Sequence, residues 1–175
     1  MDVNNLRTGE KIAGASGIAL LLLMFVLNWF NIEGAGDLGG LNAWQSFGII
    51  DLVLLLAALA GIGLAFVSAG QTSVNLPVSL SALAAGLGIL SVALLIFRII
   101  SPPDLEGFGV EVELERAIGV FLGLIAAAGV AYGGWTAMQE EGTSFSDQAD
   151  RLQGPGTDAG TGGTPPPPPP AGPAA

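Results

Sequence analysis

The sequence predicts an all-α membrane protein, a four-helix transmembrane bundle followed by a disordered Pro/Gly-rich C-terminal tail. Of its 175 residues, 51% are hydrophobic and only 11% are charged, whereas a typical soluble domain has about 25% charged residues. Four apolar stretches have about the length, roughly 20 residues, that a helix needs to cross a bilayer core of about 30 Å. After Gly142 the composition changes abruptly to Gly, Pro, Thr and Asp.

The predicted spans are apolar runs bounded by turn-forming or charged residues. Pro102 and Pro103 cannot continue a helix, and Pro77 is compatible with a first helical turn. Arg7 and Lys11 precede the first run as in a signal peptide, but no small-residue cleavage motif follows, so we expect this run to remain as a span. The four spans cover residues 12–30, 47–67, 76–100 and 117–138.

Basic residues determine the predicted orientation. Arg7 and Lys11 precede the first span, whereas Arg98 and Arg116 flank the third connection. Because the first helix usually dominates under the positive-inside rule, we expect both termini in the cytoplasm. Tryptophans near span ends are expected to be aromatic anchors at the membrane interface; they are Trp29, Trp44 and Trp135.

Small residues at four-residue spacing are expected to hold the helices together. Lipid tails are as apolar as Leu, so close backbone approach and polar contacts must drive association. Such motifs serve both packing within one bundle and homodimerisation, and we favour packing within the bundle because three of the four spans carry them. The packing glycines are Gly61, Gly86, Gly119, Gly123, Gly129 and Gly133.

Asp51 is the most informative polar residue because it lies about one turn inside the second span. A carboxylate inside a membrane normally faces the bundle and finds a partner. Arg98, near the end of the third span, shares its depth because consecutive helices are antiparallel, and Asn28 lies at the same level. We therefore predict a polar layer of Asn28, Asp51 and Arg98 under the outer surface, with Arg116 as a further candidate. We interpret this layer as a structural clamp, with a proton or ion pathway as the alternative.

The inner half of the bundle is predicted to hold almost no ionisable side chain, which argues against a relay of polar groups across the membrane. The chain also has no His and no Cys. Without His it lacks both the commonest general base and the commonest metal ligand, and without Cys it lacks thiolate chemistry. A net charge of −10 with five basic residues disfavours nucleic acid, since phosphate contacts need clustered Lys and Arg. We expect no catalytic, cofactor-binding or metal site.

The stretch 110–115 alternates apolar and acidic residues. As a strand it is short and has no obvious partner. As the first turns of the fourth helix, its acids lie where the macrodipole favours them, and we prefer the helix. Weak divalent-cation binding by the outer acids is a further alternative, although calcium sites need converging oxygens.

Residues 1–141 form the predicted membrane domain, and residues 142–175 form the predicted low-complexity tail. Six consecutive prolines near its end favour polyproline II, which packs no core. We favour a solvated tail, and the alternative is a ligand for a proline-binding domain, although no basic residue flanks the run to set its orientation. Phe145, Ala149 and Leu152 share one helical face, so we predict a short interfacial helix before the tail. Its acidic polar face is expected to weaken attachment to anionic lipid.

Several stretches resemble a known group of proteins. They are the run LRTGEKIAG from Leu6, the run NAWQSFGIID ending at Asp51, and the run GGWTAMQEE from Gly133. Over residues 6–141 the chain resembles small, uncharacterised bacterial integral membrane proteins with four predicted transmembrane helices. The resemblance implies a bacterial cytoplasmic membrane and brings no activity with it.

The leading functional prediction is a non-enzymatic scaffold or accessory subunit whose acidic outer loops or tail contact a partner. The expected partners are the lipid bilayer and either another membrane protein or further copies of this chain. The alternative is a small transporter or channel component acting as an oligomer. A polar face along the full depth of one helix would favour transport, and the sequence shows none.

Overall fold

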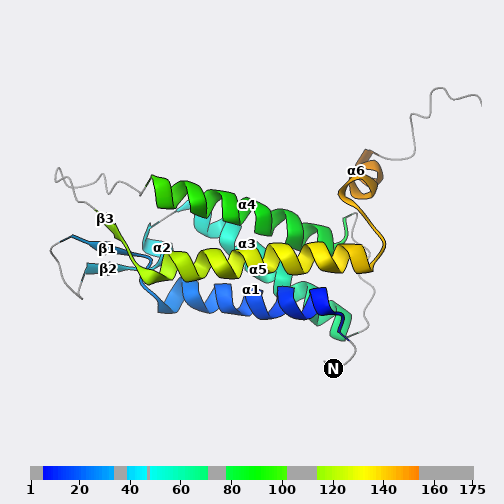
Figure 1. The fold of residues 1–175 in the computed structure, drawn as a ribbon, viewed down its shortest axis with the longest axis horizontal. Helices are drawn as coiled ribbons and strands as arrows, with labels where there is room; N and C mark the ends of the chain where they lie inside the picture. The colour runs from blue at the N-terminus through cyan, green and yellow to red at the C-terminus, as the bar shows by residue number, and fades with distance from the viewer. Residues whose placement is uncertain (1–5, 34–38, 47, 71–77, 102–113, 154–175) are drawn as a thin grey trace, which may run out of the picture.

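The computed structural model describes residues 6–33, 39–46, 48–70, 78–101 and 114–153. Within them, four long apolar helices run side by side as an antiparallel bundle (Figure 1). Each is long and apolar enough to cross a membrane, which makes the chain a multi-pass integral membrane protein with the predicted all-α bundle. The helices are α1 (Thr8–Val26), α3 (Ile49–Ala69), α4 (Leu80–Ile100) and α5 (Ile118–Glu140).

The helices form a ring in which each packs against the next along the chain. Helix α1 contacts α3 and α5, and α4 contacts the same two helices from the other side. Since the chain reverses at each connection, α1 begins and α5 ends at the same end of the bundle, on the right in Figure 1. We term this the terminal end, and the opposite end the sheet end.

A small antiparallel sheet lies at the sheet end. In the described part of the chain, β1 (Phe30–Ile32) is flanked by β2 (Gly40–Leu41) and β3 (Leu114–Arg116). Phe30 pairs with Leu41 on one side and with Arg116 on the other. The short helix α2 (Ala43–Ser46) then leads from the sheet toward α3. The sheet therefore joins the connection after α1 to the segment before α5.

Strand β3 shows that the helical interpretation of the stretch 110–115 is wrong at residues 114 and 115. The last helix begins only at Ile118, and residues 110–113 lie outside the described residues. The strand partner is β1, which lies partly within the predicted first span, whereas α1 already ends at Val26. Backbone groups that leave a helix near the membrane need new partners, and pairing with β2 and β3 satisfies those of β1.

The other three spans lie within a few residues of the predicted ranges 47–67, 76–100 and 117–138. After α5, the backbone N–H of Gly142 donates to the Gln139 oxygen (3.0 Å), and that of Thr143 donates to the Met138 oxygen (3.1 Å). This is a Schellman turn, in which the glycine takes a positive φ, here 69°.

Helix α6 (Phe145–Gln153) follows this turn. The predicted short helix is therefore present, at the start of the segment 142–175. Residues 154–175, including the proline run, lie outside the described residues.

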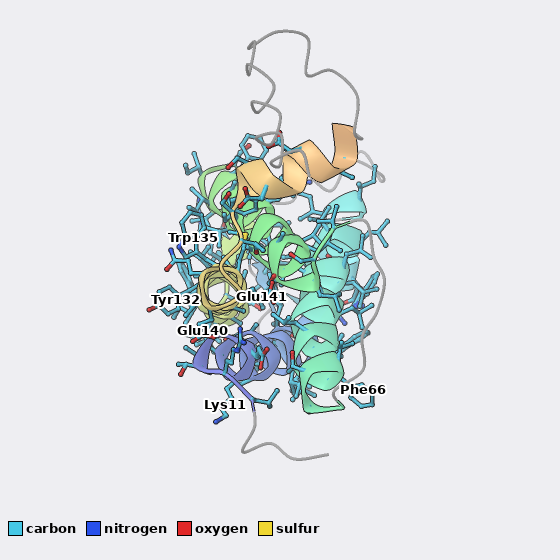
Figure 2. The ribbon with its side chains drawn as sticks, turned by 90° about the vertical axis from the view of Figure 1, so that its right-hand side faces the viewer. Lys11, Phe66, Tyr132, Trp135, Glu140 and Glu141 are labelled. Carbon is cyan, nitrogen blue, oxygen red and sulfur yellow. The ribbon has the colours of Figure 1, made fainter. Side chains whose placement is uncertain are left out.

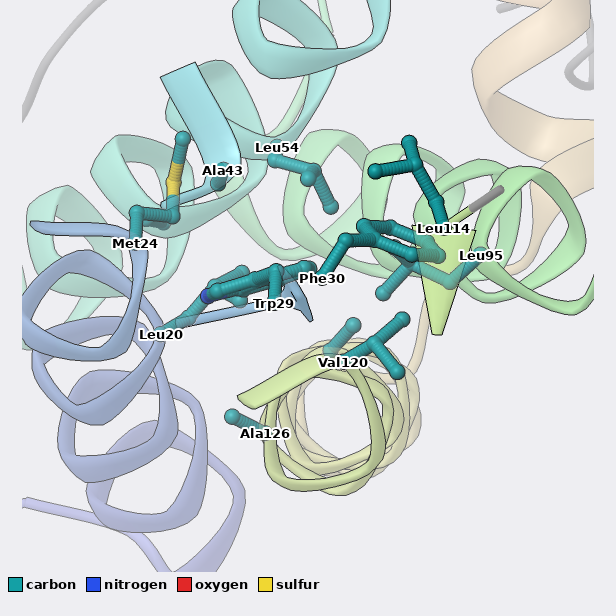
Figure 3. Packing of buried hydrophobic residues seen from close by; sticks show 12 residues of the cluster. Leu20, Met24, Trp29, Phe30, Ala43, Leu54, Leu95, Leu114, Val120 and Ala126 are labelled. Atoms are coloured by element: carbon teal, nitrogen blue, oxygen red, sulfur yellow. The ribbon is translucent and has the colours of Figure 1, made fainter. Parts of the chain in front are cut away.

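Large side chains fill the core at the sheet end (Figure 3). Trp29 and Phe30 are fully buried among side chains that include Leu20, Leu54 and Leu95. The indole N–H of Trp29 donates to the Leu23 backbone oxygen at 2.8 Å, in the last turn of α1. Trp29 is therefore a core residue, and its predicted role as an interfacial anchor is wrong.

Five of the six predicted packing glycines face another segment of the bundle. A Cβ on Gly61 would lie 2.6 Å from the Ala13 carbonyl oxygen on α1, and a Cβ on Gly133 would overlap the Ala13 backbone nitrogen. Gly86 differs, because a Cβ there would meet nothing within 4 Å. The other three packing glycines lie close to the segment after α1 or to the side chain of Ser16 on α1. They are Gly119, Gly123 and Gly129.

Candidate functional site at the sheet end

Asp51 occupies the first turn of α3 and is fully buried. The turn into this helix depends on Gly48, whose φ of 66° and ψ of −111° are rarely accessible to residues with a Cβ. The Asp51 backbone N–H donates to the Gly48 oxygen at 3.2 Å. This position places a carboxylate at a helix N-terminus, where the positive end of the macrodipole stabilises negative charge.

The Asp51 carboxylate has electrostatic partners. Burial is the largest effect on this carboxylate and disfavours its charged form, and it is opposed in part by the backbone N–H of Gly48 and the guanidinium of Arg98. Neither meets the geometry of a hydrogen bond, since both carboxylate oxygens are buried and accept no hydrogen bond in the described part of the chain. Asp51 and Arg98 lie at one depth because each is the third residue from the sheet end of its helix.

Arg116 contacts a different group. Its Nε donates to the Ile99 backbone oxygen at 2.6 Å. Ile99 lies in the last turn of α4, where carbonyl groups lack an intrahelical donor. A cation at this position also interacts favourably with the negative end of the macrodipole. Arg116 therefore caps α4 and attaches β3 to it.

Asn28 lies at an exposed position and makes no hydrogen bond to the Asp51 carboxylate, whose oxygens accept none from the described residues. A Cβ on Gly40 would overlap its side-chain amide, so this amide packs against β2. Its backbone oxygen accepts a hydrogen bond from the Gly119 N–H at 3.1 Å, and the neighbouring Trp29 oxygen accepts one from the Ala117 N–H at 3.0 Å. The structure places Asp51 and Arg98 at one depth, and it places Asn28 and Arg116 at the same end in separate contacts. The predicted polar layer itself stays a prediction.

The arrangement offers little for acid–base or metal chemistry. One buried carboxylate and one guanidinium lie at the same depth, and the described residues contain no group of three or more His, Cys, Asp or Glu that could hold a metal ion. The arrangement can hold the sheet end together, because hydrogen bonds around β1 and β3 connect the segments next to α1, α4 and α5. The role of the Asp51–Arg98 pair as a clamp stays a prediction.

The terminal end also carries polar contacts, which the sequence interpretation missed. Ser81, buried at the start of α4, donates through Oγ to Glu141 Oε2 at 2.6 Å. The Arg7 guanidinium donates to the Glu140 backbone oxygen at 2.8 Å. Glu10 is only 8% exposed and accepts a hydrogen bond from the Arg7 N–H.

The inner half almost without ionisable side chains stays a prediction; Glu10 is a buried acid in the first turn of α1, just before the predicted first span, 12–30. Glu10 is the third residue after the N-cap Arg7, the position from which an acidic side chain reaches back to the N-cap N–H, although Arg7 is not one of the residues that mark a capping box in a sequence. The burial of its side chain depends on the neighbouring helices.

The chain matches no protein-family model, no curated protein and no solved structure. The resemblance to small bacterial membrane proteins stays a prediction. Evidence about function comes from the architecture of the bundle and its two ends.

Proposed function

We propose that this protein is a non-enzymatic scaffold or accessory subunit of a bacterial cytoplasmic membrane, with both termini in the cytoplasm. In this role the bundle holds the sheet end in place, and the sheet end contacts a membrane protein partner. The observation that carries the proposal is the distribution of polar groups in a bundle whose helices are closely packed.

Buried polar side chains of the described residues are separated along the bundle. Glu10 and Ser81 lie at the terminal end, Ser46 and Asp51 lie at the sheet end, and Ser91 lies near the middle of α4. Transport of protons or ions through a bundle normally uses a series of polar groups across the membrane. This separation favours a structural role over transport through a single copy.

Close backbone contacts favour the same role. A Cβ on Gly88 of α4 would lie 2.5 Å from the backbone nitrogen of Ala131 on α5. A Cβ on Gly17 of α1 would lie 2.6 Å from the backbone oxygen of Ala58 on α3. Tightly packed interiors do not deform continuously. Such packing suits a bundle that serves as a fixed support.

The sheet end is acidic, and this character indicates the kind of partner. Glu33 and Glu115 are exposed there, and the sequence that connects α4 to β3 contains four further acids, Asp104, Glu106, Glu111 and Glu113. Complementary charge steers association and selects partners. The partner surface is therefore expected to be basic.

Purification from native membranes tests the proposal. The wild-type protein, extracted in mild detergent, is expected to carry a partner in fixed stoichiometry. The variant Glu115→Lys should lose it, because the charge reversal lies on exposed strand β3. Glu140→Lys is the matched control, since it makes the same charge change at the terminal end and should keep the partner. Equal retention by both variants would contradict a contact at the sheet end.

The buried Asp51 favours one alternative, a transporter or channel component formed by several copies. Reconstitution into liposomes distinguishes it from the scaffold. If the purified protein runs as a homo-oligomer and dissipates an ion gradient, and if Asp51→Asn abolishes the flux, the scaffold proposal is wrong.

A further inference from the structure

Helix α6 is amphipathic, and the bundle leaves its apolar face largely uncovered. Phe145, Ala149 and Leu152 follow the spacing of one helical face. Phe145 keeps 39% and Leu152 keeps 62% of its surface exposed. Asp147 and Asp150 lie on the other side of this helix.

A capping box defines the start of α6. The Ser144 backbone N–H donates to Asp147 Oδ2 at 2.8 Å, and the Asp147 N–H donates to Ser144 Oγ at 3.3 Å. These reciprocal bonds satisfy donors that a helix start would otherwise leave open. Short helices are marginal in water without tertiary packing, so this helix needs an environment for its apolar face.

The direction of α6 fits a membrane surface. Figure 2 views the molecule from the terminal end, and α6 lies there across the bundle, transverse to the long helices. A helix transverse to transmembrane helices runs parallel to the membrane plane. The Schellman turn at Gly142 produces this change of direction directly after α5.

One ring contact establishes which way the apolar face points. The rings of Phe145 and Trp135 lie 5.7 Å apart between centroids. Trp135 precedes the last residue of α5, Glu140, by about one and a half turns, so Phe145 points back toward the depth of α5. Leu152 lies two turns further along the same face. The apolar face of α6 is therefore directed toward the membrane rather than away from it.

The exposed aromatic surface of α5 continues into α6. Tyr132 and Trp135 lie one turn apart on α5, with 62% and 42% of their surface exposed (Figure 2). Tyr and Trp are enriched at the membrane–water interface. These rings place α6 at the level where an interfacial helix inserts its apolar side chains.

We propose that α6 is an interfacial helix whose Phe145–Leu152 face docks on the lipid surface of the membrane that the bundle crosses. The polar side with Asp147 and Asp150 faces water. Because the connection from α5 is short, attachment is intramolecular and needs little intrinsic affinity. The acidic residues favour a zwitterionic over an anionic surface.

Site-specific labelling tests this proposal, and the chain has no native cysteine to interfere. Leu152→Cys and Asp150→Cys each receive a spin label in the full-length protein, reconstituted into phosphatidylcholine vesicles. Oxygen partitions into lipid, whereas a nickel chelate stays in water. The ratio of oxygen to nickel accessibility is expected to be several-fold higher at position 152 than at position 150, which serves as the matched control.

A second variant examines the contact that orients the helix. Adding Phe145→Ala to Leu152→Cys should lower the ratio at position 152 toward that at position 150, because the helix loses its contact with Trp135. Equal ratios at positions 150 and 152 in the otherwise wild-type chain would overturn the proposal. Protection of position 152 from both reagents would also overturn it, because protein rather than lipid would then cover the face.

Discussion

Arg116 on β3 donates a hydrogen bond of 2.6 Å from its Nε to the backbone oxygen of Ile99 in the last turn of α4. This contact joins the small sheet directly to helix α4. Together with the pairing of β3 and β1, it makes the sheet end a single connected unit.

Replacing Arg116 should loosen this unit. Arg116→Gln removes the charged donor from the C-terminus of α4, and we expect the free energy of unfolding to fall by about 1 kcal/mol, because the group is exposed and hydrogen bonds there contribute modestly. Thermal unfolding in detergent micelles measures the loss. The nearby Glu115→Gln, on an exposed side chain of the same strand, is the control and should unfold like the wild type. An unchanged midpoint for Arg116→Gln would show that the cap contributes nothing.

Asp51 and Arg98 should behave as a coupled pair. We expect Asp51→Asn and Arg98→Gln each to lower the free energy of unfolding by about 1–2 kcal/mol, less than for a fully buried ion pair, because Arg98 is only partly buried. Exchanging the two residues should restore part of the loss. A double-mutant cycle measures the coupling; strictly additive losses would exclude the pairing.

Gly48 should tolerate no side chain. Gly48→Ala places a Cβ at φ 66° and ψ −111°, and the strain should lower the free energy of unfolding by about 1–3 kcal/mol. A Cβ at this position meets no atom within 4 Å, so the loss comes from the backbone alone. Gly63→Ala is the control, since Gly63 lies within α3 and also has open space around it. Chemical denaturation of both variants compares the two effects, and equal stabilities would show that the turn is not strained.

Gly86 and Gly133 should respond in opposite ways to alanine. Gly133→Ala pushes a methyl group into the Ala13 backbone and should cost about 1–3 kcal/mol of stability. Gly86→Ala meets no neighbour in the bundle and should be neutral or stabilising by up to about 1 kcal/mol, because Ala is the better helix former.

The measurement for this pair is the unfolding midpoint combined with the molecular mass in detergent. A loss of stability and a shift to lower mass for Gly86→Ala would mean that Gly86 contacts a second copy. Homodimerisation would then replace packing within one bundle as the role of that face.

The outcome at Asp51 illustrates what local pattern reveals. The depth of Asp51 and Arg98 could be predicted because helical rise and antiparallel succession place residues at known levels. The contacts of Asn28 and Arg116 could not, because each depends on where a strand from a distant segment lies. The same holds for β3, whose short alternating pattern has no visible partner in the sequence.

The sequence by itself determined the four spans, the apolar face of the helix at residues 145–152 and the lack of His and Cys chemistry, because hydropathy, periodicity and composition are local properties. The tertiary structure alone decided that Trp29 enters the core, that Gly86 faces outward while Gly133 packs on Ala13, and that Glu10 is buried. The physical reason is that a helical pattern gives the angle of each side chain about its own axis, whereas burial depends on which neighbouring segment occupies that direction.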